Sequence, residues 1–379
     1  MYDTFGGFSG YFQKGRVSHI DNSTFRLHYR FTFGLLILCS MLVTLTQFFG
    51  APISCIVEGV SQSVMDTHCW IHGTFTIPSH LTKEVGTEVP HPGVAPLHNR
   101  VQQNESGHIS WTEDGDEIRH AWYQWVCLVL FFQAVLCYTP HYLWKLNEGG
   151  KLDMLIQGLD GVMLHGTEAA EDKRKAVVAY YVRTIQSHNP YVFKFVLCEV
   201  LNLVNILFQI FLMDIFFNGQ FTTYGSEVLS VSEQPFETRT DPMNRVFPKV
   251  TKCSFHFYGT SGTVQLRDGL CILAMNIINE KIFVLLWFWF IFVTIWTAIH
   301  LMFRMVSIAS RHSRFMLLCN RARLVNRSDI STVLEKANYG DWFLLMQMSK
   351  HVNDRVFHAV LLDLRDRIDK KRAANLSQE

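Results

Sequence analysis

Four cysteines are the residues of this chain whose type and spacing indicate covalent chemistry. Cys55 and Cys69 form one pair in the sequence, and Cys253 and Cys271 form a second pair far downstream. An even set of cysteines in an oxidising compartment indicates disulfides. Four cysteines allow three pairings, and the spacing alone does not choose between them.

A zinc site is the alternative chemistry for part of this set. His68 and His72 flank Cys69, and His256 follows Cys253. Zinc accepts cysteine and histidine ligands, but the string HCWIH lacks the paired-ligand spacing of structural zinc sites. We therefore expect neither a metal nor another cofactor.

Four apolar segments are the elements that must position these cysteines. The chain has 379 residues, of which 49% are hydrophobic and 13% aromatic, a composition that favours a membrane protein over soluble domains. About 20 apolar residues in a helix cross the ~30 Å hydrocarbon layer. The predicted spans are residues 31–49, 122–144, 192–217 and 282–306.

Lysine and arginine residues predict how these spans are oriented. They are frequent in the segments 1–30, 145–191 and 307–379, and absent from the first twenty residues after the first and third spans. The positive-inside rule then places both termini and the loop 145–191 in the cytoplasm. The loops 50–121 and 218–281, which carry the four cysteines, are extracellular. The net charge of +1 predicts no nucleic-acid partner.

The remaining five cysteines lie in spans or on the cytoplasmic side, where we expect free thiols. They are Cys39, Cys127, Cys137, Cys198 and Cys319. Of four glycosylation sequons, only the one at Asn104 lies in an extracellular loop, and it is the candidate glycan site.

Two spans carry polar side chains on one helical face. In the first span Ser40, Thr44 and Gln47 follow each other at helical spacing. This face is a candidate pore lining in an oligomer, and the alternative is hydrogen bonding to its own or neighbouring helices. The third span carries a similar set, for which we expect hydrogen bonds within the bundle, with gating or subunit contact as the alternative. Its members are Glu199, Asn202, Asn205 and Gln209.

The segment 307–379 is predicted to be helical rather than disordered. Residues 356–368 keep their apolar side chains on one helical face. Gly340 and Asp341 indicate the start of another helix, with Asp341 as its N-cap. We expect these helices to pack with those of the loop 145–191 as a cytoplasmic cap at a pore entrance.

Particular strings in this topology indicate a family. They are DNSTFRLHYR from residue 21, YQWVCLVLFFQA from 123, YTPHYLWK from 138, DPMNRVFPKVTKCSFHFYG from 241 and GDWFLL from 340. Tyr123, Gln124 and Trp125, followed by Pro140, are diagnostic. The chain closely resembles the innexins, the invertebrate gap-junction family related to pannexins. Trp122 departs from the tyrosine usual in the family, and an indole suits the same interfacial position.

The resemblance implies a ring of subunits, octameric by family analogy. The ring would contain this chain alone or together with other innexins. The N-terminal residues Met1, Tyr2, Asp3 and Phe5 would form a funnel in the pore, and Ser40, Thr44 and Gln47 would line it. The resemblance also implies two disulfides, Cys55 with Cys271 and Cys69 with Cys253. These tie the outer loops into one unit that docks on the channel of an adjacent cell.

The expected fold is an all-α four-helix membrane bundle with a small disulfide-bonded α+β extracellular region, a helical cytoplasmic domain and a ring assembly. The expected function is a gap-junction or hemichannel subunit in the plasma membrane that passes ions and small metabolites passively. The alternatives are a hemichannel that never docks and a four-span adhesion protein. No catalytic set indicates an enzyme, and nothing pairs His141 with His300 as haem ligands.

Overall fold

A computed structural model describes residues 22–94, 101–103, 109–111, 117–156, 159, 168–232 and 242–376. The chain divides into two compact units. Unit 1 comprises Met1–Tyr29, Tyr138–Val204 and Ile295–Glu379, and unit 2 comprises Arg30–Cys137 and Asn205–Thr294. The expected funnel residues Met1, Tyr2, Asp3 and Phe5 and the sequon residue Asn104 lie outside the described residues.

Four helices of the described chain are long and apolar enough to cross a membrane. The first runs over Ser23–Phe49 and consists of α2 (Ser23–Arg26), the π-helical turn η1 (Leu27–Thr32) and α3 (Phe33–Phe49). The others are α5 (Val126–Glu148), α8 (Asn189–Phe216) and α11 (Met275–Ala309).

These helices overlap the four predicted spans but differ from them at their ends. The first and the last begin seven or more residues early, because a helix continues beyond the hydrocarbon layer where capping and packing favour it. The predicted second span begins at Trp122, whereas Trp122–Gln124 forms the 3₁₀ turn η4 that leads into α5. Pro140 lies inside α5.

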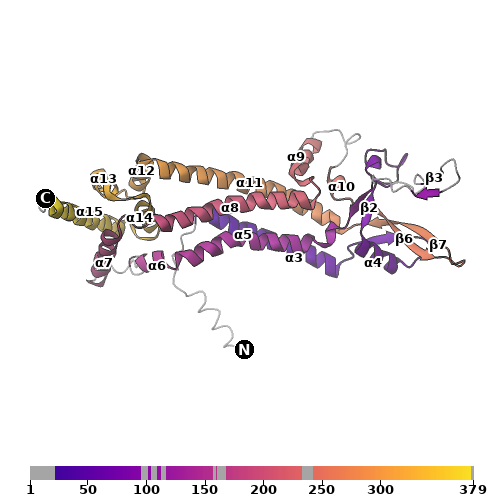
Figure 1. Ribbon diagram of the computed structural model, residues 1–379, viewed down its shortest axis with the longest axis horizontal. Helices are drawn as coiled ribbons and strands as arrows, with labels where there is room; N and C mark the ends of the chain where they lie inside the picture. Colours follow the sequence, from indigo (N-terminus) through magenta and orange to yellow (C-terminus); the bar gives the residue numbers. More distant parts are fainter. Residues whose placement is uncertain are drawn as a thin grey trace, which may run out of the picture. The chain divides into compact units, whose positions relative to one another are not determined.

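A five-stranded antiparallel sheet in unit 2 is formed by both long loops (Figure 1). Its order is β1-β7-β6-β2-β5. The strands are β1 (Ser54–Ile56), β2 (Thr74–Thr76), β5 (Ile118–His120), β6 (Val250–Tyr258) and β7 (Val264–Ile272). The helix α4 (Gln62–His72) joins β1 to β2. A separate pair, β3 (Val101–Gln103) and β4 (Ile109–Trp111), belongs to the first loop.

An aromatic cluster forms the core of unit 2 next to these loops. The short helix α9 (Phe221–Ser232) contributes to this cluster, and the short helix α10 (Pro242–Val246) leads into it. Phe217, Phe247 and Phe283 are almost fully buried, and their ring centroids lie 4.8 to 5.5 Å apart. Edge and stacked contacts of this kind add to the free energy gained by burial alone. The second loop is therefore packed against the ends of α8 and α11.

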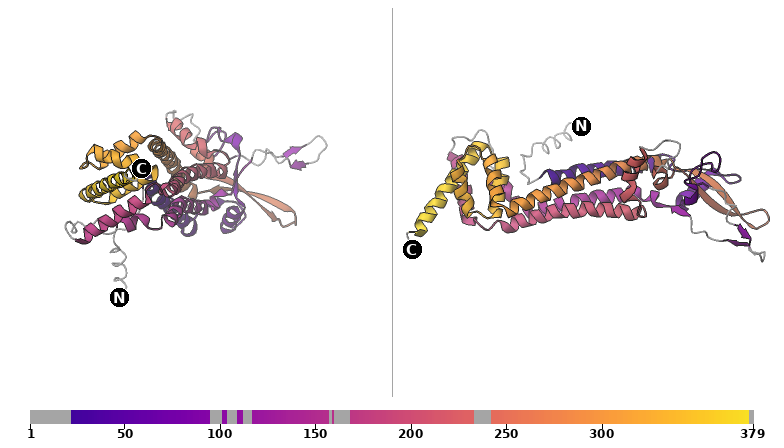
Figure 2. Two further views of the ribbon diagram at one scale, coloured as in Figure 1. Left: turned by 60° about the vertical axis from the view of Figure 1, so that its left-hand side comes forward. Right: turned by 90° about the horizontal axis from the view of Figure 1, so that it is seen from above.

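In the described part of unit 1, six shorter helices outside the membrane-spanning ones surround one hydrophobic core. They are α6 (Lys151–Ile156), α7 (Glu168–Thr184), α12 (Arg311–Arg321), α13 (Arg327–Lys336), α14 (Tyr339–His351) and α15 (Asp354–Leu376). Figure 2 shows α12 to α15, coloured from orange to yellow, gathered in one group. The core draws residues from the loop 145–191 and from the C-terminal segment, so the expected packing between these two segments is confirmed.

The predicted amphipathic helix over 356–368 lies within α15, where Val360, Leu361 and Leu364 are buried. The prediction that Asp341 is an N-cap is wrong. Asn338 is the N-cap of α14, and Asp341 is the third helical residue of the same capping box. Both positions favour Asp and Asn, so the local sequence is compatible with either start.

Candidate functional site

Two disulfides join the long loops of unit 2. Cys55 is bonded to Cys271 and Cys69 to Cys253, the pairing that the family resemblance implies. The register of the sheet brings the first pair together, because Cys55 of β1 lies directly opposite Cys271 of β7. The bridges connect residues 216 and 184 positions apart in the chain. Each one therefore restricts a very large loop of the unfolded chain.

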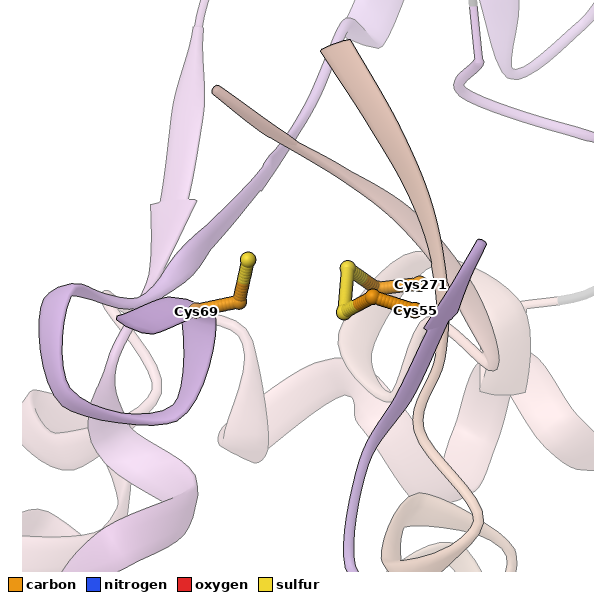
Figure 3. A group of neighbouring side chains, drawn as sticks. All are labelled: Cys55, Cys69 and Cys271. Atoms are coloured by element: carbon orange, nitrogen blue, oxygen red, sulfur yellow. A yellow bond between two sulfur atoms is a disulfide. The ribbon is translucent and has the colours of Figure 1, made fainter. Parts of the chain in front are cut away.

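The sulfur atoms of this region are engaged in covalent bonds rather than available to a metal. Figure 3 shows the disulfide of Cys55 and Cys271, with the side chain of Cys69 beside it. The three sulfurs lie within 4.8 Å of one another. A disulfide sulfur is not the thiolate that binds zinc. The two cysteines of the zinc alternative, Cys69 and Cys253, are bonded to each other.

The diagnostic Tyr-Gln pair at the start of α5 holds the helix α4. The Tyr123 hydroxyl is buried and donates a hydrogen bond to the Cys69 carbonyl oxygen at 3.1 Å. The Gln124 side-chain amide donates to the carbonyl oxygen of Trp70. The Trp70 carbonyl thereby gains a hydrogen-bond donor at the C-terminus of α4, and the Cys69 carbonyl, which also accepts from the N–H of Gly73, gains a second one. The motif thus positions Cys69 beside its disulfide partner.

His120 on β5 is a buried histidine in the same sheet. Its Nε2 lies 2.8 Å from the Thr76 hydroxyl, and its side chain is almost inaccessible. Burial disfavours the charged imidazolium and lowers the pKa of His120 to about 4. The folded chain therefore keeps this residue neutral across the range in which an unfolded histidine gains a proton.

We expect the stability of unit 2 to fall as the pH falls from about 6.5 to about 4. An unfolded histidine has a pKa of about 6.5, so below this pH the unfolded chain binds a proton that folded His120 does not. At pH 5 the expected loss is about 2 kcal/mol relative to neutral pH. His120→Asn should reduce the drop in melting temperature between pH 7.5 and pH 5. The exposed His72→Asn is the control, and an equal drop in wild type and His120→Asn would contradict this assignment.

The polar face of α3 is divided between the bundle and the surface of the single chain. The Ser40 hydroxyl is buried and donates to the carbonyl oxygen of Cys127 on α5 at 2.9 Å. The Thr44 hydroxyl donates back to the Ser40 carbonyl at 2.8 Å. Gln47 is half-buried. The hydrogen bonds of Ser40 to a neighbouring helix and of Thr44 to its own helix are those of the alternative, whereas Thr44 and Gln47 also keep accessible surface.

The other exposed side chains of α3 are apolar. Leu38, Met41, Leu45 and Phe48 are each more than half exposed in the single chain. A surface of this kind requires lipid or a neighbouring subunit.

Hydrogen bonds from α8 to α5 satisfy part of the polar face of the third span. The Gln209 amide donates to the carbonyl oxygen of Gln133 at 3.1 Å, and it lies 3.8 Å from the Cys137 sulfur. The Asn205 amide contacts the same sulfur at 3.8 Å. The Asn202 amide bonds the carbonyl of Cys198 within its own helix. The expectation of hydrogen bonds within the bundle is confirmed for Gln209 and Asn205.

Glu199, the acid of this set, forms a buried ion pair in unit 1. Arg304 of α11 donates two hydrogen bonds to the two carboxylate oxygens of Glu199, at 2.9 and 2.8 Å. Asn22, just before α2, donates a third at 2.5 Å. Glu199 is 1% exposed and Arg304 8%. The pair therefore fixes the first, third and fourth long helices to one another.

Aromatic rings enclose the guanidinium group of this pair. Arg304 lies 5.5 Å from the ring centroid of Phe195 and 5.4 Å from that of Phe343. Phe343 belongs to the GDWFLL string on α14, so the ion pair also contacts the C-terminal helices. Arg304 was not among the residues predicted from the sequence. A lone arginine near the end of an apolar span was the available signal, because such a charge requires a partner.

The candidate haem ligands have separate contacts. His141 stacks on Tyr29 with ring centroids 3.8 Å apart, and His300 Nδ1 lies 3.7 Å from a Glu199 carboxylate oxygen.

Four apolar helices, a small disulfide-bonded sheet and a domain of short helices define the class of this protein as a multi-pass membrane protein. The family model "Innexin" matches residues 21–368. The chain belongs to the innexin family, whose members form gap-junction channels and assemble into oligomers. It is therefore a channel protein and not an enzyme.

Named relatives cover almost the whole chain. Innexin inx2 of Drosophila melanogaster is 46% identical over 365 residues, which are 96% of this chain and 95% of the relative. Innexin inx2 of Schistocerca americana is 45% identical over 372 residues, with 98% and 99% covered. Innexin shaking-B of Drosophila melanogaster is 39% identical over 356 residues, with 93% and 92% covered.

Proposed function

We propose that this chain forms a large-pore channel that is a ring of subunits, octameric by family analogy, and that docks between cells. The pore passes ions and small metabolites down their gradients without coupling to an energy source. The ring contains this chain alone or together with other innexins. The observation that carries the proposal is the disulfide-bonded sheet, which makes one rigid surface from two loops far apart in the chain.

The sheet supports docking because it presents a long hairpin. β6 and β7 pair over nine residues each, and the exposed side chains near their turn include Tyr258 at 76% and Val264 at 63%. Apolar side chains on an accessible hairpin favour contact with another protein surface. A second copy of the same surface on the adjacent cell is the proposed partner. A glycan on Asn104 would oppose this contact by its bulk.

Two independent features support the proposed orientation of the chain in the membrane. Disulfides persist outside the cytosol, so the sheet belongs on the extracellular face of the plasma membrane. The Lys- and Arg-rich segments belong to unit 1, which supports a cytoplasmic position for this unit and for both termini. Both features support the same orientation for all four long helices.

The proposed pore is lined by the N-terminal residues Met1, Tyr2, Asp3 and Phe5 and by one face of α3. Thr44 and Gln47 keep accessible surface and are the lining candidates on this helix. Ser40 is turned toward α5, so we assign it to helix packing within the subunit.

Dye uptake by isolated cells tests the channel and its lining together. Cells that express the chain are expected to take up a small anionic or cationic dye through undocked channels. A membrane-impermeant thiol reagent is expected to block uptake through Gln47→Cys or Thr44→Cys but not through Ser40→Cys or the wild type. Block of the Ser40 variant alone would reverse the assignment of faces, and absence of uptake in every variant present at the surface would contradict an open hemichannel.

A hemichannel that never docks is the second candidate function. It predicts uptake by single cells and no transfer between paired cells. A four-span adhesion protein predicts neither.

A further inference from the structure

A cavity of about 240 Å³ in unit 1 lies at the N-terminal end of α8. It is formed by the end of α5, by α6 and α7, by the first turn of α8 and by α14. Its polar lining residues are Asn147, Lys151, Tyr180, Ser187, His188 and Lys194. None of these residues belongs to the contacts described above.

The charged groups of the lining are two lysines. Within the part of the chain that the structure describes, neither Lys151 nor Lys194 forms an ion pair. The Lys151 ammonium lies 5.7 Å from the ring centroid of Tyr191, which also lines the cavity. Both ammonium groups therefore keep their hydrogen-bond donors for a ligand.

Two glycines explain how Lys151 reaches this position. Gly149 and Gly150 have φ values of +60° and +73°, a backbone conformation that few other residues adopt. They end α5 and allow α6 to start at Lys151 in a new direction.

The start of α8 adds a second source of positive potential. Ser187 and His188 come just before this helix of 28 residues, and Pro190 and Tyr191 lie in its first turn. The unpaired N–H groups and the dipole of a helix N-terminus favour an anion. The Tyr191 hydroxyl independently indicates a ligand in the cavity, because this oxygen is buried and has no hydrogen-bond partner among the described residues. A ligand oxygen in the cavity would supply that partner.

The carboxylates near the cavity already have partners. Asp341 accepts a hydrogen bond from His188 Nδ1 at 2.7 Å and others from the N–H groups of Gln186 and Asn338. Glu148 accepts from the N–H of Leu152 at 3.3 Å, and its charge also acts on Tyr191. The contact with Asp341 leaves Nε2 of His188 beside the Tyr180 hydroxyl, at 3.4 Å.

Two of the helices that form the cavity also carry exposed apolar side chains. Phe193 and Leu197 of α8 are 69% and 56% exposed, and Met154 of α6 is 63% exposed. Leu155, Pro190 and Leu344 supply apolar wall to the cavity itself. A ligand with a phosphorylated head and acyl chains would satisfy both kinds of surface.

We infer that this cavity binds the phosphate groups of a polyvalent organic phosphate, supplied either by the headgroup of a phosphorylated lipid or by a soluble phosphate ester. Lys151 and Lys194 pair with the phosphate oxygens, the Tyr191 hydroxyl donates a hydrogen bond to them, and the dipole at the start of α8 adds favourable potential. The case in which a lipid headgroup is the ligand rests on the proposed orientation, in which the cavity lies at the cytoplasmic face of the membrane.

Binding to the purified full-length protein in neutral phosphatidylcholine nanodiscs tests the inference without any channel measurement. The probes are dioctanoyl phosphatidylinositol bisphosphate, inositol trisphosphate and, as the neutral reference, dioctanoyl phosphatidylcholine. Tight binding of the first probe alone identifies a lipid ligand. Equal binding of the first two identifies a soluble phosphate ester. Binding of both no tighter than the neutral reference overturns the inference.

Variants of matched charge test the assignment of residues. Lys151→Gln/Lys194→Gln is expected to weaken binding by at least about tenfold, because it removes two charge-assisted hydrogen bonds to phosphate oxygens. The control Lys175→Gln/Lys370→Gln removes two exposed lysines elsewhere in unit 1 and should leave binding within about twofold. Equal weakening by the two double variants would overturn the site in favour of general surface charge.

Tyr191→Phe keeps the ring and removes only the hydroxyl. It is expected to weaken binding by about threefold to tenfold, the effect of one hydrogen bond. Unchanged elution of the oligomer shows that the variant is folded. Wild-type binding by a folded Tyr191→Phe protein would remove this residue from the site and contradict the hydrogen bond proposed for it.

Discussion

Replacing both Cys55 and Cys271 with serine is expected to abolish electrical coupling between paired cells that express this chain. The bridge joins β1 to β7 across a separation of 216 residues, and its loss removes a restriction on the unfolded chain. Loss of a native disulfide of this kind typically costs about 2–5 kcal/mol. The exposed hairpin would then keep only one of its two covalent attachments to the first loop, the bridge of Cys69 and Cys253, and the docking surface requires both. Junctional conductance and surface labelling are the measurements.

The free cysteine Cys319 supplies the matched control. Cys319→Ser makes the same replacement of sulfur by oxygen at a cysteine of unit 1 that forms no disulfide. This variant should leave coupling unchanged. The double variant avoids the unpaired thiol that a single replacement would leave beside Cys69. Full coupling by Cys55→Ser/Cys271→Ser at normal surface level would contradict the role of the bridged sheet in docking.

Replacing Arg304 with methionine is expected to remove most folded protein from the cell surface. Glu199 is 1% exposed, and among the described residues it would keep the hydrogen bond from the Asn22 amide and the His300 Nδ1 at 3.7 Å but lose both guanidinium hydrogen bonds. Breaking a buried pair by removing one partner costs about 3–5 kcal/mol, a large part of the stability of a typical protein. Surface labelling and the melting temperature of the purified protein are the measurements.

A double variant separates the charge from the packing. Glu199→Gln/Arg304→Met removes both charges, keeps the volume and should restore much of the stability that Arg304→Met loses. Arg304→Lys should recover less, since an ammonium group does not reproduce the two parallel hydrogen bonds. Arg355→Met is the control at an exposed position of α15. If the double variant were no more stable than Arg304→Met, the unpaired charge would not be the cause of the loss.

The membrane helices were predictable because each carries its own signal. An apolar run of sufficient length spans a bilayer whatever its neighbours are, and four such runs are present in the sequence and in the structure. The ends of the helices were less predictable. Trp122 belongs to a 3₁₀ turn because Tyr123 and Gln124 bond the end of α4, a contact with residues far away in the chain.

The sites depend on partners that local sequence does not indicate. The spacing of Ser40, Thr44 and Gln47 predicts one helical face, but only the position of α5 shows that Ser40 is turned inward. Glu199 was recognisable as a costly charge, whereas its partner Arg304 lies 105 residues away. The cavity at the start of α8 has walls from five helices, so no motif in the sequence describes it. The disulfide pairing came from family resemblance, since three pairings fit the spacing.

Junctional conductance between two cells that have no coupling of their own tests the central claim most directly. The claim is that this chain alone forms a channel that joins cells through its disulfide-bonded sheet. Pairs in which both cells express the chain are expected to show conductance, and pairs in which only one cell expresses it are expected to show none. Absence of conductance in doubly expressing pairs, with the protein present at the contact and dye uptake intact in single cells, would contradict the junction.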